Sequence, residues 1–176
     1  MKRVMIIGQP GSGKSTLARQ LGEITGLPVV HIDKIQHKPG WRERSQAEKT
    51  VLCREVHARE QWIFEGGHST TWAERLMRAD TLIWLDFPVG TRLWRVTKRT
   101  IKHFGRSRPD MPENCPERFS LEFYHWIWAT RKTSREKAAK LFDHVPADKT
   151  RRVLRSNEEV AAYLSDLTAS DAVLPS

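Results

Sequence analysis

Residues 4 to 16 of the chain read Val-Met-Ile-Ile-Gly-Gln-Pro-Gly-Ser-Gly-Lys-Ser-Thr. Within this stretch, Gly8 to Ser15 follow the pattern Gly-x4-Gly-Lys-[Ser/Thr], which is typical of a loop that cradles phosphate groups. An apolar run before the loop predicts a buried strand, and apolar residues at helical spacing follow it. The sequence therefore predicts a strand, a phosphate-binding loop (P-loop) and a helix in direct succession.

The residue types in this loop fit the binding of a nucleoside triphosphate. Glycine backbones adopt left-handed conformations and approach an anion closely, so successive N–H groups form a nest at the N-terminus of a helix. Lys14 would bring a positive charge to the β- and γ-phosphates, and the Ser15 hydroxyl would coordinate Mg²⁺. The predicted nucleotide site comprises Gly8, Pro10, Gly11, Ser12, Gly13, Lys14, Ser15 and Thr16.

Length and composition limit the class of protein. The chain has 176 residues, a formal net charge of +9 and two isolated cysteines without a metal-binding spacing. We expect one domain over residues 1–168 and a frayed tail over residues 169–176. The positive charge favours an anionic partner, and nucleotides, phosphorylated metabolites and nucleic acids all qualify. Without an apolar run of membrane-spanning length or a signal peptide, the expected location is the cytoplasm.

Apolar runs that predict strands alternate with segments that predict helices. Strands are expected near residues 2–7, 27–32, 61–65, 81–85 and 152–154, and helices near 14–25, 45–59, 70–77, 88–104, 117–142 and 156–167. This order predicts an α/β fold with a parallel sheet, helices on both faces and ligands at the carboxyl ends of the strands. The polar stretch 105–118 contains three prolines and is expected to form a lid that excludes water.

Acidic residues follow three of these strands. Asp33 comes after the second strand, where a carboxylate would orient an attacking hydroxyl or accept its proton; a helix cap or a solvated turn is the alternative. Glu65 ends the third strand and would hold a water of the Mg²⁺ shell, or else pair with a buried basic group. Asp86 is the second candidate for the Mg²⁺ role and equally fits a helix cap. Gly66 and Gly67 would bring the backbone close to the acceptor.

Residues 91–108 contain seven basic side chains and no acid. Arg92, Arg95, Arg99, Lys102 and Arg106 follow one another at helical spacing and would share one face. Because like charges in such a row repel, we expect phosphate oxygens or a charged transition state to neutralise them. A solvated basic face and a stripe that binds nucleic acid are the alternatives.

Two further arginines are candidates for contacts with the ligands. Arg131 lies on the predicted helix after the lid, where it could contact a phosphate. Arg155 follows the last strand, where a doubly wound P-loop fold places the adenine, although Ser156 and Glu159 also form a capping box there.

Several segments resemble the bacterial topology-modulation-protein family, which belongs to the adenylate-kinase-like and shikimate-kinase-like P-loop kinases. The resemblance covers about residues 2 to 168. It rests on Gly8-Gln-Pro-Gly-Ser-Gly-Lys-Ser-Thr, His31-Ile-Asp, Lys38-Pro-Gly-Trp, Trp62-Ile-Phe-Glu-Gly, Ala79-Asp-Thr-Leu-Ile-Trp-Leu-Asp-Phe-Pro and Arg106-Ser-Arg-Pro-Asp-Met. The Pro-Gly-Trp and Arg-Pro-Asp-Met segments are more specific to the family than the P-loop.

The resemblance implies a five-stranded sheet in the order 2-3-1-4-5, a lid after the fourth strand, ATP as donor and Mg²⁺. It implies that Asp33 and Arg42 contact the acceptor, and that Arg95 and Arg99 lie at the base of the lid, one near the adenine and one at the phosphates. Arg106 would contribute to the substrate site from the lid. The family often has Asp followed by Gly-Asn where this chain has Glu65-Gly-Gly-His, which leaves the acceptor undefined.

Two functions of different classes follow. The first is a kinase that transfers the γ-phosphate of ATP to a nucleotide, a nucleoside or another small hydroxyl compound by positioning and charge neutralisation. The second is a nucleotide-dependent regulator that binds nucleic acid through the basic face from Arg92 to Arg108, as the family's name suggests. No element of the sequence is typical of DNA reading, so the kinase is the favoured hypothesis.

Overall fold

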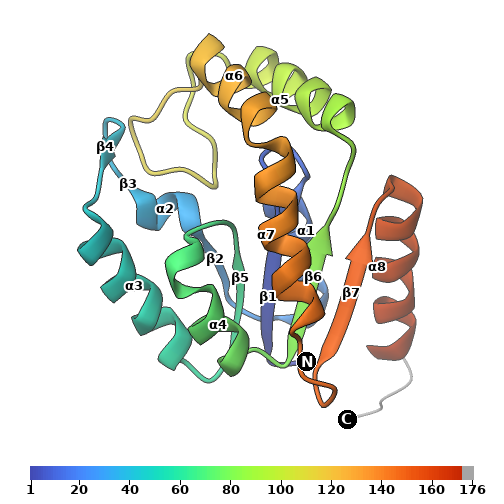
Figure 1. Cartoon of the computed structure of the whole chain (residues 1–176). Helices are drawn as coiled ribbons and strands as arrows, with labels where there is room; N and C mark the ends of the chain where they lie inside the picture. The colour runs from blue at the N-terminus through green and yellow to red at the C-terminus, as the bar shows by residue number, and fades with distance from the viewer. Residues whose placement is uncertain (172–176) are drawn as a thin grey trace.

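The computed structural model of the protein describes residues 1–171, and its centre is a five-stranded parallel sheet (Figure 1). The strands are β1 (Arg3–Gly8), β2 (Val29–His31), β5 (Trp62–Glu65), β6 (Thr81–Leu85) and β7 (Thr150–Leu154). They lie side by side in the order β2-β5-β1-β6-β7. Numbered among themselves along the chain, these strands have the order 2-3-1-4-5, as the resemblance implied.

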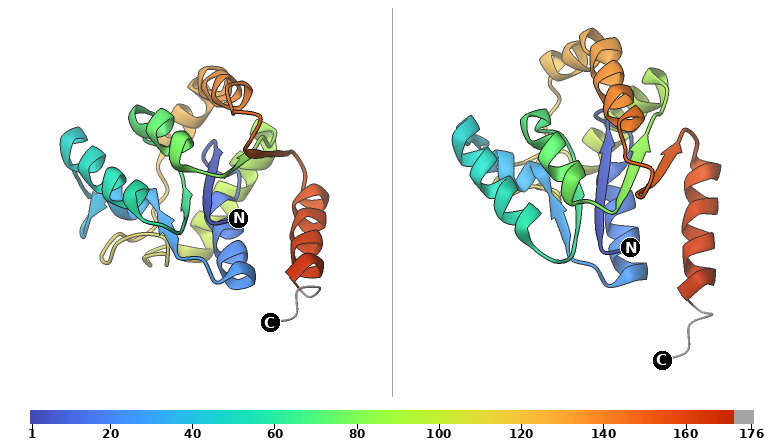
Figure 2. Two further views of the ribbon diagram at one scale, coloured as in Figure 1. Left: turned by 90° about the horizontal axis from the view of Figure 1, so that it is seen from below. Right: turned by 60° about the horizontal axis from the view of Figure 1, so that its bottom comes forward.

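Helices cover both faces of the sheet because β1 buries alternate residues in two cores. Val4 and Ile6 pack against α1 (Lys14–Thr25) and α8 (Asn157–Asp171), whereas Met5 and Ile7 face the other side. That second core is closed by α3 (Gln46–Ala58), α4 (Trp72–Arg78) and α7 (Arg131–Asp143). Figure 2 shows the two groups of helices on opposite sides of the sheet. The predicted α/β class with helices on both faces is confirmed.

The remaining elements surround the carboxyl ends of the strands. A short helix, α2 (Ile32–Gln36), and a hairpin of β3 (His37–Lys38) and β4 (Arg42–Glu43) follow β2, and a 3-10 turn, η1 (Ser69–Thr71), precedes α4. Helix α5 (Val89–His103) leads into the lid, which covers residues 104–120 and ends at α6 (Leu121–Ala129).

Three features differ from the expectations. The sequence did not predict α2 or the hairpin, whose elements have at most five residues and too little periodicity to detect. The single helix expected over residues 117–142 begins later and is divided at Thr130 into α6 and α7. Helix α8 continues to Asp171, beyond the expected start of the tail, and the rest of that tail, residues 172–176, lies outside the described residues.

The lid is attached to the hairpin by hydrogen bonds from Trp41. The Trp41 backbone N–H donates to Cys115 Sγ (3.3 Å), and its indole Nε1–H donates to the Pro116 carbonyl (3.1 Å). The lid therefore forms one continuous wall with the β3–β4 hairpin.

None of the helices within residues 1–171 has the length and apolarity needed to span a membrane.

Candidate functional site

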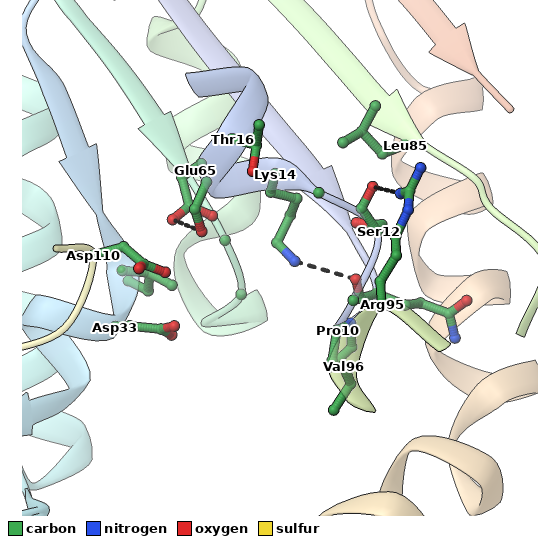
Figure 3. A pocket seen from close by; sticks show the side chains of 18 of the residues that line it. Pro10, Ser12, Lys14, Thr16, Asp33, Glu65, Leu85, Arg95, Val96 and Asp110 are labelled. Atoms are coloured by element: carbon green, nitrogen blue, oxygen red, sulfur yellow. Dashed lines mark hydrogen bonds between the residues drawn. The ribbon is translucent and has the colours of Figure 1, made fainter. Parts of the chain in front are cut away.

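A cavity of about 1320 Å³ opens at the carboxyl ends of the strands. Its walls are the P-loop, α2, the β3–β4 hairpin, the loop after β5, α5 and the lid. Small-molecule pockets usually measure roughly 300–1000 Å³. This cavity therefore has room for two ligands side by side, and Figure 3 shows the side chains that line it.

The P-loop has a left-handed backbone geometry that glycine adopts without strain. Gly13 begins α1 with a φ of 98°, and Gly11 has a φ of 77°. A Cβ added to Gly11 would lie 2.4 Å from the Arg92 carbonyl oxygen, so a larger residue would push the loop away from α5. The backbone N–H groups at the N-terminus of α1 consequently border the cavity, in the arrangement that binds phosphate.

Lys14 extends into the cavity from the start of α1 (Figure 3). Its Nζ donates to the Gln9 carbonyl at 3.2 Å. Burial lowers the pKa of Lys14, while the nearby carboxylates of Glu65 and Asp33 act in the opposite direction. An ammonium group held in this way interacts strongly with a phosphate, because little water screens it.

Glu65 lies beside Ser15, as expected if Ser15 coordinates Mg²⁺ and Glu65 holds a water of the Mg²⁺ shell. Its buried carboxylate accepts a hydrogen bond from Ser15 Oγ (3.0 Å), and Oε1 also lies 2.8 Å from His31 Nδ1. The basic partner considered as an alternative is therefore present as well. Within residues 1–171 no cluster of three or more His, Cys, Asp or Glu side chains is arranged to hold a metal ion. Mg²⁺ bound to nucleotide phosphates needs only one or two protein oxygens.

Asp33 lies in the first turn of α2 and points into the cavity, opposite Lys14 (Figure 3). It is not a helix cap, since His31 occupies the N-cap position of α2. Burial and the nearby Glu65 carboxylate raise the pKa of Asp33, and Lys14 and Arg108 counteract part of that effect. A carboxyl group with this environment is suited to accept a proton from a hydroxyl.

The side chains of the arginine row on α5 have partners within the protein, and one of them, Arg99, is paired with a carboxylate, that of Glu117. Arg92 is buried and donates to the carbonyls of Phe87 (3.2 Å) and Pro10 (3.3 Å). Arg95 and Arg99 line the cavity, where Arg95 donates to the Ser12 carbonyl (2.7 Å). Arg92 and Arg95 therefore hold the backbone of the P-loop, and Arg95 and Arg99 also border the cavity.

Four predicted contact residues do not form part of the described cavity walls: Arg42, Arg106, Arg131 and Arg155. Arg42 is exposed on the hairpin, where its Nε donates to the Pro39 carbonyl, and Arg106 is exposed on the lid. Arg131 donates to the Trp128 carbonyl at 2.6 Å, and Arg155 Nε lies 3.8 Å from Asp86. The N-terminus of α8, which follows β7, instead contributes Asn157 to the cavity.

Asp86 also lies outside these walls. Both of its carboxylate oxygens accept hydrogen bonds from Arg135, at 2.8 and 2.7 Å. This bidentate pair connects the end of β6 to α7, so the structure favours Glu65 over Asp86 as the carboxylate near bound Mg²⁺. Gly66, Gly67 and His68 line the cavity, as expected of the loop after the third sheet strand.

The sequence interpretation missed the lid acids Asp110 and Glu117 and their pairing with Arg108. Arg108 Nη1 donates to Asp110 at 2.7 Å, and Arg108 Nε lies 2.8 Å from Glu117, which also accepts from Arg99 and Thr100. Burial acts to raise the pKa of Asp110, but Arg108 holds it below its ordinary value. The Arg-Pro-Asp-Met segment was the feature of the sequence that could have indicated these residues. Their ion pairs, however, depend on how the lid folds.

Arg75 and two tryptophans were also missed. Arg75 is fully buried, lies 3.8 Å above the Phe64 ring and donates to the carbonyls of Gly66 (3.2 Å) and Gly67 (3.3 Å). Trp41 and Trp72 line the cavity. Arg75 thus holds the loop after β5 in place from inside the core.

No protein-family profile matches the chain, but individual proteins do. A cytidylate kinase of Pyrobaculum aerophilum is 30% identical over 132 residues, which cover 67% of this chain and 69% of that protein. A shikimate kinase of Persephonella marina is 29% identical over 106 residues, covering 52% of this chain and 65% of that protein.

Solved structures share the whole fold. The structure of shikimate kinase from Acinetobacter baumannii in complex with shikimate aligns with a TM-score of 0.58 and 18% identity, covering 99% of this chain and 96% of that one. Deoxyadenosine kinase from M. mycoides with bound dCTP aligns with a TM-score of 0.53 and 13% identity, covering 94% and 98%. With the sequence relatives, these likenesses establish that the chain belongs to the P-loop kinase family and is a phosphotransferase that acts on a small acceptor.

Proposed function

We propose that the protein transfers the γ-phosphate of ATP to a hydroxyl group or a phosphate group of a small acceptor. The observation that carries this proposal is the position of Asp33 opposite Lys14 in one cavity with room for two ligands. The P-loop side of this cavity is the donor half, and the side formed by α2, the hairpin, the loop after β5 and the lid is the acceptor half.

In the donor half, the residues from Gly8 to Thr16 would bind the triphosphate through backbone N–H groups, with Lys14 at the β- and γ-phosphates. Arg95 and Arg99 would contact the phosphates or the adenine from α5. Ser15 and Glu65 fit a bound Mg²⁺, because their oxygens lie 3.0 Å apart beside the P-loop. The ion would neutralise charge on the phosphates when bound.

In the acceptor half, Asp33 would orient the acceptor hydroxyl and take its proton. A bond forms between that oxygen and the γ-phosphorus, the bond to the β–γ bridging oxygen breaks, and ADP leaves. The raised pKa of Asp33 suits this role, since a carboxylate with a higher pKa is a stronger base. Gly66 and Gly67 leave room for the acceptor beside it.

The alternative function, binding of nucleic acid through the basic face of α5, gains little support. Arg92 is buried, Arg95 donates to the P-loop backbone and Arg99 is paired with Glu117. Arg92 is therefore out of reach of a nucleic-acid backbone, and Arg95 and Arg99 line the nucleotide cavity. If six to eight cations bound duplex DNA, the affinity for DNA would fall on the order of 10³-fold between 50 and 200 mM salt. A measured loss of that size would support the alternative function.

We also propose the narrower assignment to the topology-modulation-protein family. Its two characteristic segments, Lys38-Pro-Gly-Trp and Arg106-Ser-Arg-Pro-Asp-Met, lie in adjoining walls of the cavity. The hydrogen bonds of Trp41 to Cys115 and Pro116 connect the hairpin to the lid.

Transfer of labelled γ-phosphate tests the kinase proposal directly. The protein is incubated with labelled ATP and Mg²⁺, with and without a panel of nucleosides, nucleoside monophosphates, hydroxy acids and sugar alcohols. We expect label in at least one acceptor, at a rate well above hydrolysis to free phosphate. Equal hydrolysis with and without every acceptor, and no labelled acceptor, would contradict it.

A further inference from the structure

Buried carboxylates are a main feature of the acceptor half. Four carboxylates border the cavity around it: Asp33, Glu65, Asp110 and Glu117. Three of them are almost completely buried: Glu65, Asp110 and Glu117. An acceptor that carries its own negative charge would meet these groups at short range in a poorly hydrated space, where repulsion is strong.

The arginines that could compensate for this charge are already engaged. Arg108 contacts both Asp110 and Glu117, and Arg99 donates to Glu117 through Nε (3.2 Å) and Nη2 (3.0 Å). Arg75 is occupied by the Gly66 and Gly67 carbonyls. An anionic acceptor would have to break these pairs and leave a buried carboxylate without its partner, which is costly.

Two cations at this end of the cavity, Arg118 and Lys102, are exposed to solvent. The Arg118 guanidinium lies 6.0 Å from the centre of the Trp41 ring. Water and salt screen charges at such a rim, so they attract anions from a distance but contribute little inside.

The acceptor half also offers two fixed indole rings. The Trp41 Nε1–H donates to the Pro116 carbonyl and the Trp72 Nε1–H donates to the Gly67 carbonyl, each at 3.1 Å. With the N–H groups used in this way, the rings present apolar surface to the cavity. The His37 ring supports Trp41 edge-on, with the ring centres 5.3 Å apart. Rigid aromatic surfaces of this kind are suited to stacking against a planar ring.

We propose that the acceptor is an uncharged hydroxyl compound with a planar ring, a nucleoside, and that nucleoside monophosphates and hydroxycarboxylic acids are excluded by charge. The inference rests on the proposed kinase function and specifies its acceptor. The base lies against Trp41 or Trp72, the sugar hydroxyl lies at Asp33, and the pairs of Arg108 and Arg99 with the lid acids stay intact.

The first test compares kcat/KM for nucleosides, the matching 5′-monophosphates, shikimate and a neutral sugar alcohol, with ATP as donor. We expect a nucleoside to exceed its monophosphate and the other compounds by at least about tenfold. A preference for a monophosphate, a hydroxy acid or the sugar alcohol overturns the inference but leaves the kinase proposal standing. Transfer to none of the compounds overturns both.

A matched pair of variants tests the ring. Trp41→Phe and Trp41→Leu both lose the hydrogen bond to Pro116, and only Trp41→Leu loses the aromatic surface. We expect the KM of the nucleoside to be about tenfold higher in Trp41→Leu than in Trp41→Phe, with the KM of ATP and the thermal midpoint equal in the two. The same pair at Trp72 covers the second ring. Equal nucleoside KM values in both pairs overturn the role of the rings.

A second pair tests the charge. Asp110→Asn removes one of the two acids that hold Arg108, whereas Glu113→Gln makes the same change of charge at an exposed lid position. We expect the nucleoside-to-monophosphate ratio of kcat/KM to fall about tenfold in Asp110→Asn and to stay unchanged in Glu113→Gln. An equal change of the ratio in both variants, or no change in either, overturns the exclusion by charge.

Discussion

The donor and acceptor halves of the cavity are built in different ways. The donor half consists mainly of one continuous segment, Gly8 to Thr16, and its main ligand groups are backbone N–H groups fixed by β1 and α1. The acceptor half is assembled from three segments that lie far apart in the sequence: α2 with the hairpin, the loop after β5, and the lid. Its properties come from side chains that make contacts across those segments, such as the Trp41 indole with the Pro116 carbonyl.

This difference explains why the two halves differ in their selectivity for a ligand. Backbone groups at a helix N-terminus recognise phosphate, which all nucleoside triphosphates share. Side chains held by other side chains define shape and charge, and those differ from one acceptor to another. Substitutions in the donor half should therefore remove activity with every acceptor, whereas substitutions in the acceptor half should change KM and selectivity.

The largest effect is expected for Lys14→Ala. The ammonium group is held at the P-loop by the Gln9 carbonyl and has no replacement at the phosphates. Phosphoryl transfer should fall by about 10³-fold with every acceptor, as for other groups that stabilise developing charge. Steady-state kinetics measures this loss, and circular dichroism checks that the fold is retained.

Lys98→Ala is the matched control for Lys14→Ala, because Lys98 is exposed on α5 outside the cavity walls. Its activity should equal that of the wild type. Wild-type turnover in Lys14→Ala would show that the P-loop does not serve as the donor site.

Asp33→Asn should have the next largest effect, and it should reduce phosphoryl transfer without changing the binding of ATP in the donor half. The carboxamide keeps the shape of the side chain but cannot accept the proton, so transfer should fall by roughly 10²-fold while ATP affinity stays the same. Calorimetric titration with ATP and transfer kinetics measure the two quantities. A parallel loss of both would assign Asp33 a structural role.

The pH profile provides a second readout for Asp33. Burial and Glu65 raise the pKa of Asp33 from its ordinary value of 3.8, and the base is active only when deprotonated. Activity in the wild type should therefore decline as pH falls, with a midpoint above 3.8, and Asp33→Asn should lack that limb. The same acid limb in the variant would mean that another group causes it.

Arg75→Met should weaken the acceptor half from within the core. It leaves the Gly66 carbonyl without its Arg75 donor and the Gly67 carbonyl with only the Trp72 Nε1–H, which should lower the free energy of unfolding by about 2–4 kcal/mol. Because these glycines line the acceptor half, the KM of the acceptor should rise about tenfold with the KM of ATP unchanged. Urea unfolding and kinetics measure both.

Arg78→Met controls for Arg75→Met, since Arg78 is an exposed arginine on the same helix. We expect it to leave both KM values unchanged. A rise in the KM of ATP equal to that of the acceptor in Arg75→Met would show that the two halves are not independent.

The smallest expected effect concerns His57, which lies beside Arg75. Burial and the charge of Arg75 lower its pKa from 6.5 to about 4. In the unfolded chain His57 is protonated near pH 6.5, whereas in the folded protein it stays neutral down to about pH 4. The free energy of unfolding should therefore fall by about 1–3 kcal/mol as the pH drops from 6.5 toward 4.

His57→Gln cannot titrate, and its unfolding free energy should change less between pH 7 and 4.5 than that of the wild type. Urea titrations at both values provide the comparison. An identical change in the two proteins would mean that other groups determine the acid sensitivity.

The sequence by itself determined the sheet and the donor half. Val4 to Ile7 and Thr81 to Leu85 are apolar runs buried on both faces of a parallel sheet, a pattern visible without the fold. The P-loop is a local motif whose spacing alone places Lys14 and Ser15 at the start of a helix. Asp33 and Glu65 were found because parallel strands end at one edge of the sheet.

Tertiary structure alone decided the rest of the site. The sequence showed an arginine row without acids, but Glu117, 18 residues beyond Arg99, neutralises part of it. Arg42 and Arg131 carry the same charge as Arg95, yet they are not among the residues that line the cavity. The physical reason is that local spacing fixes backbone geometry, whereas the direction and partner of a long charged side chain depend on distant segments that pack against it.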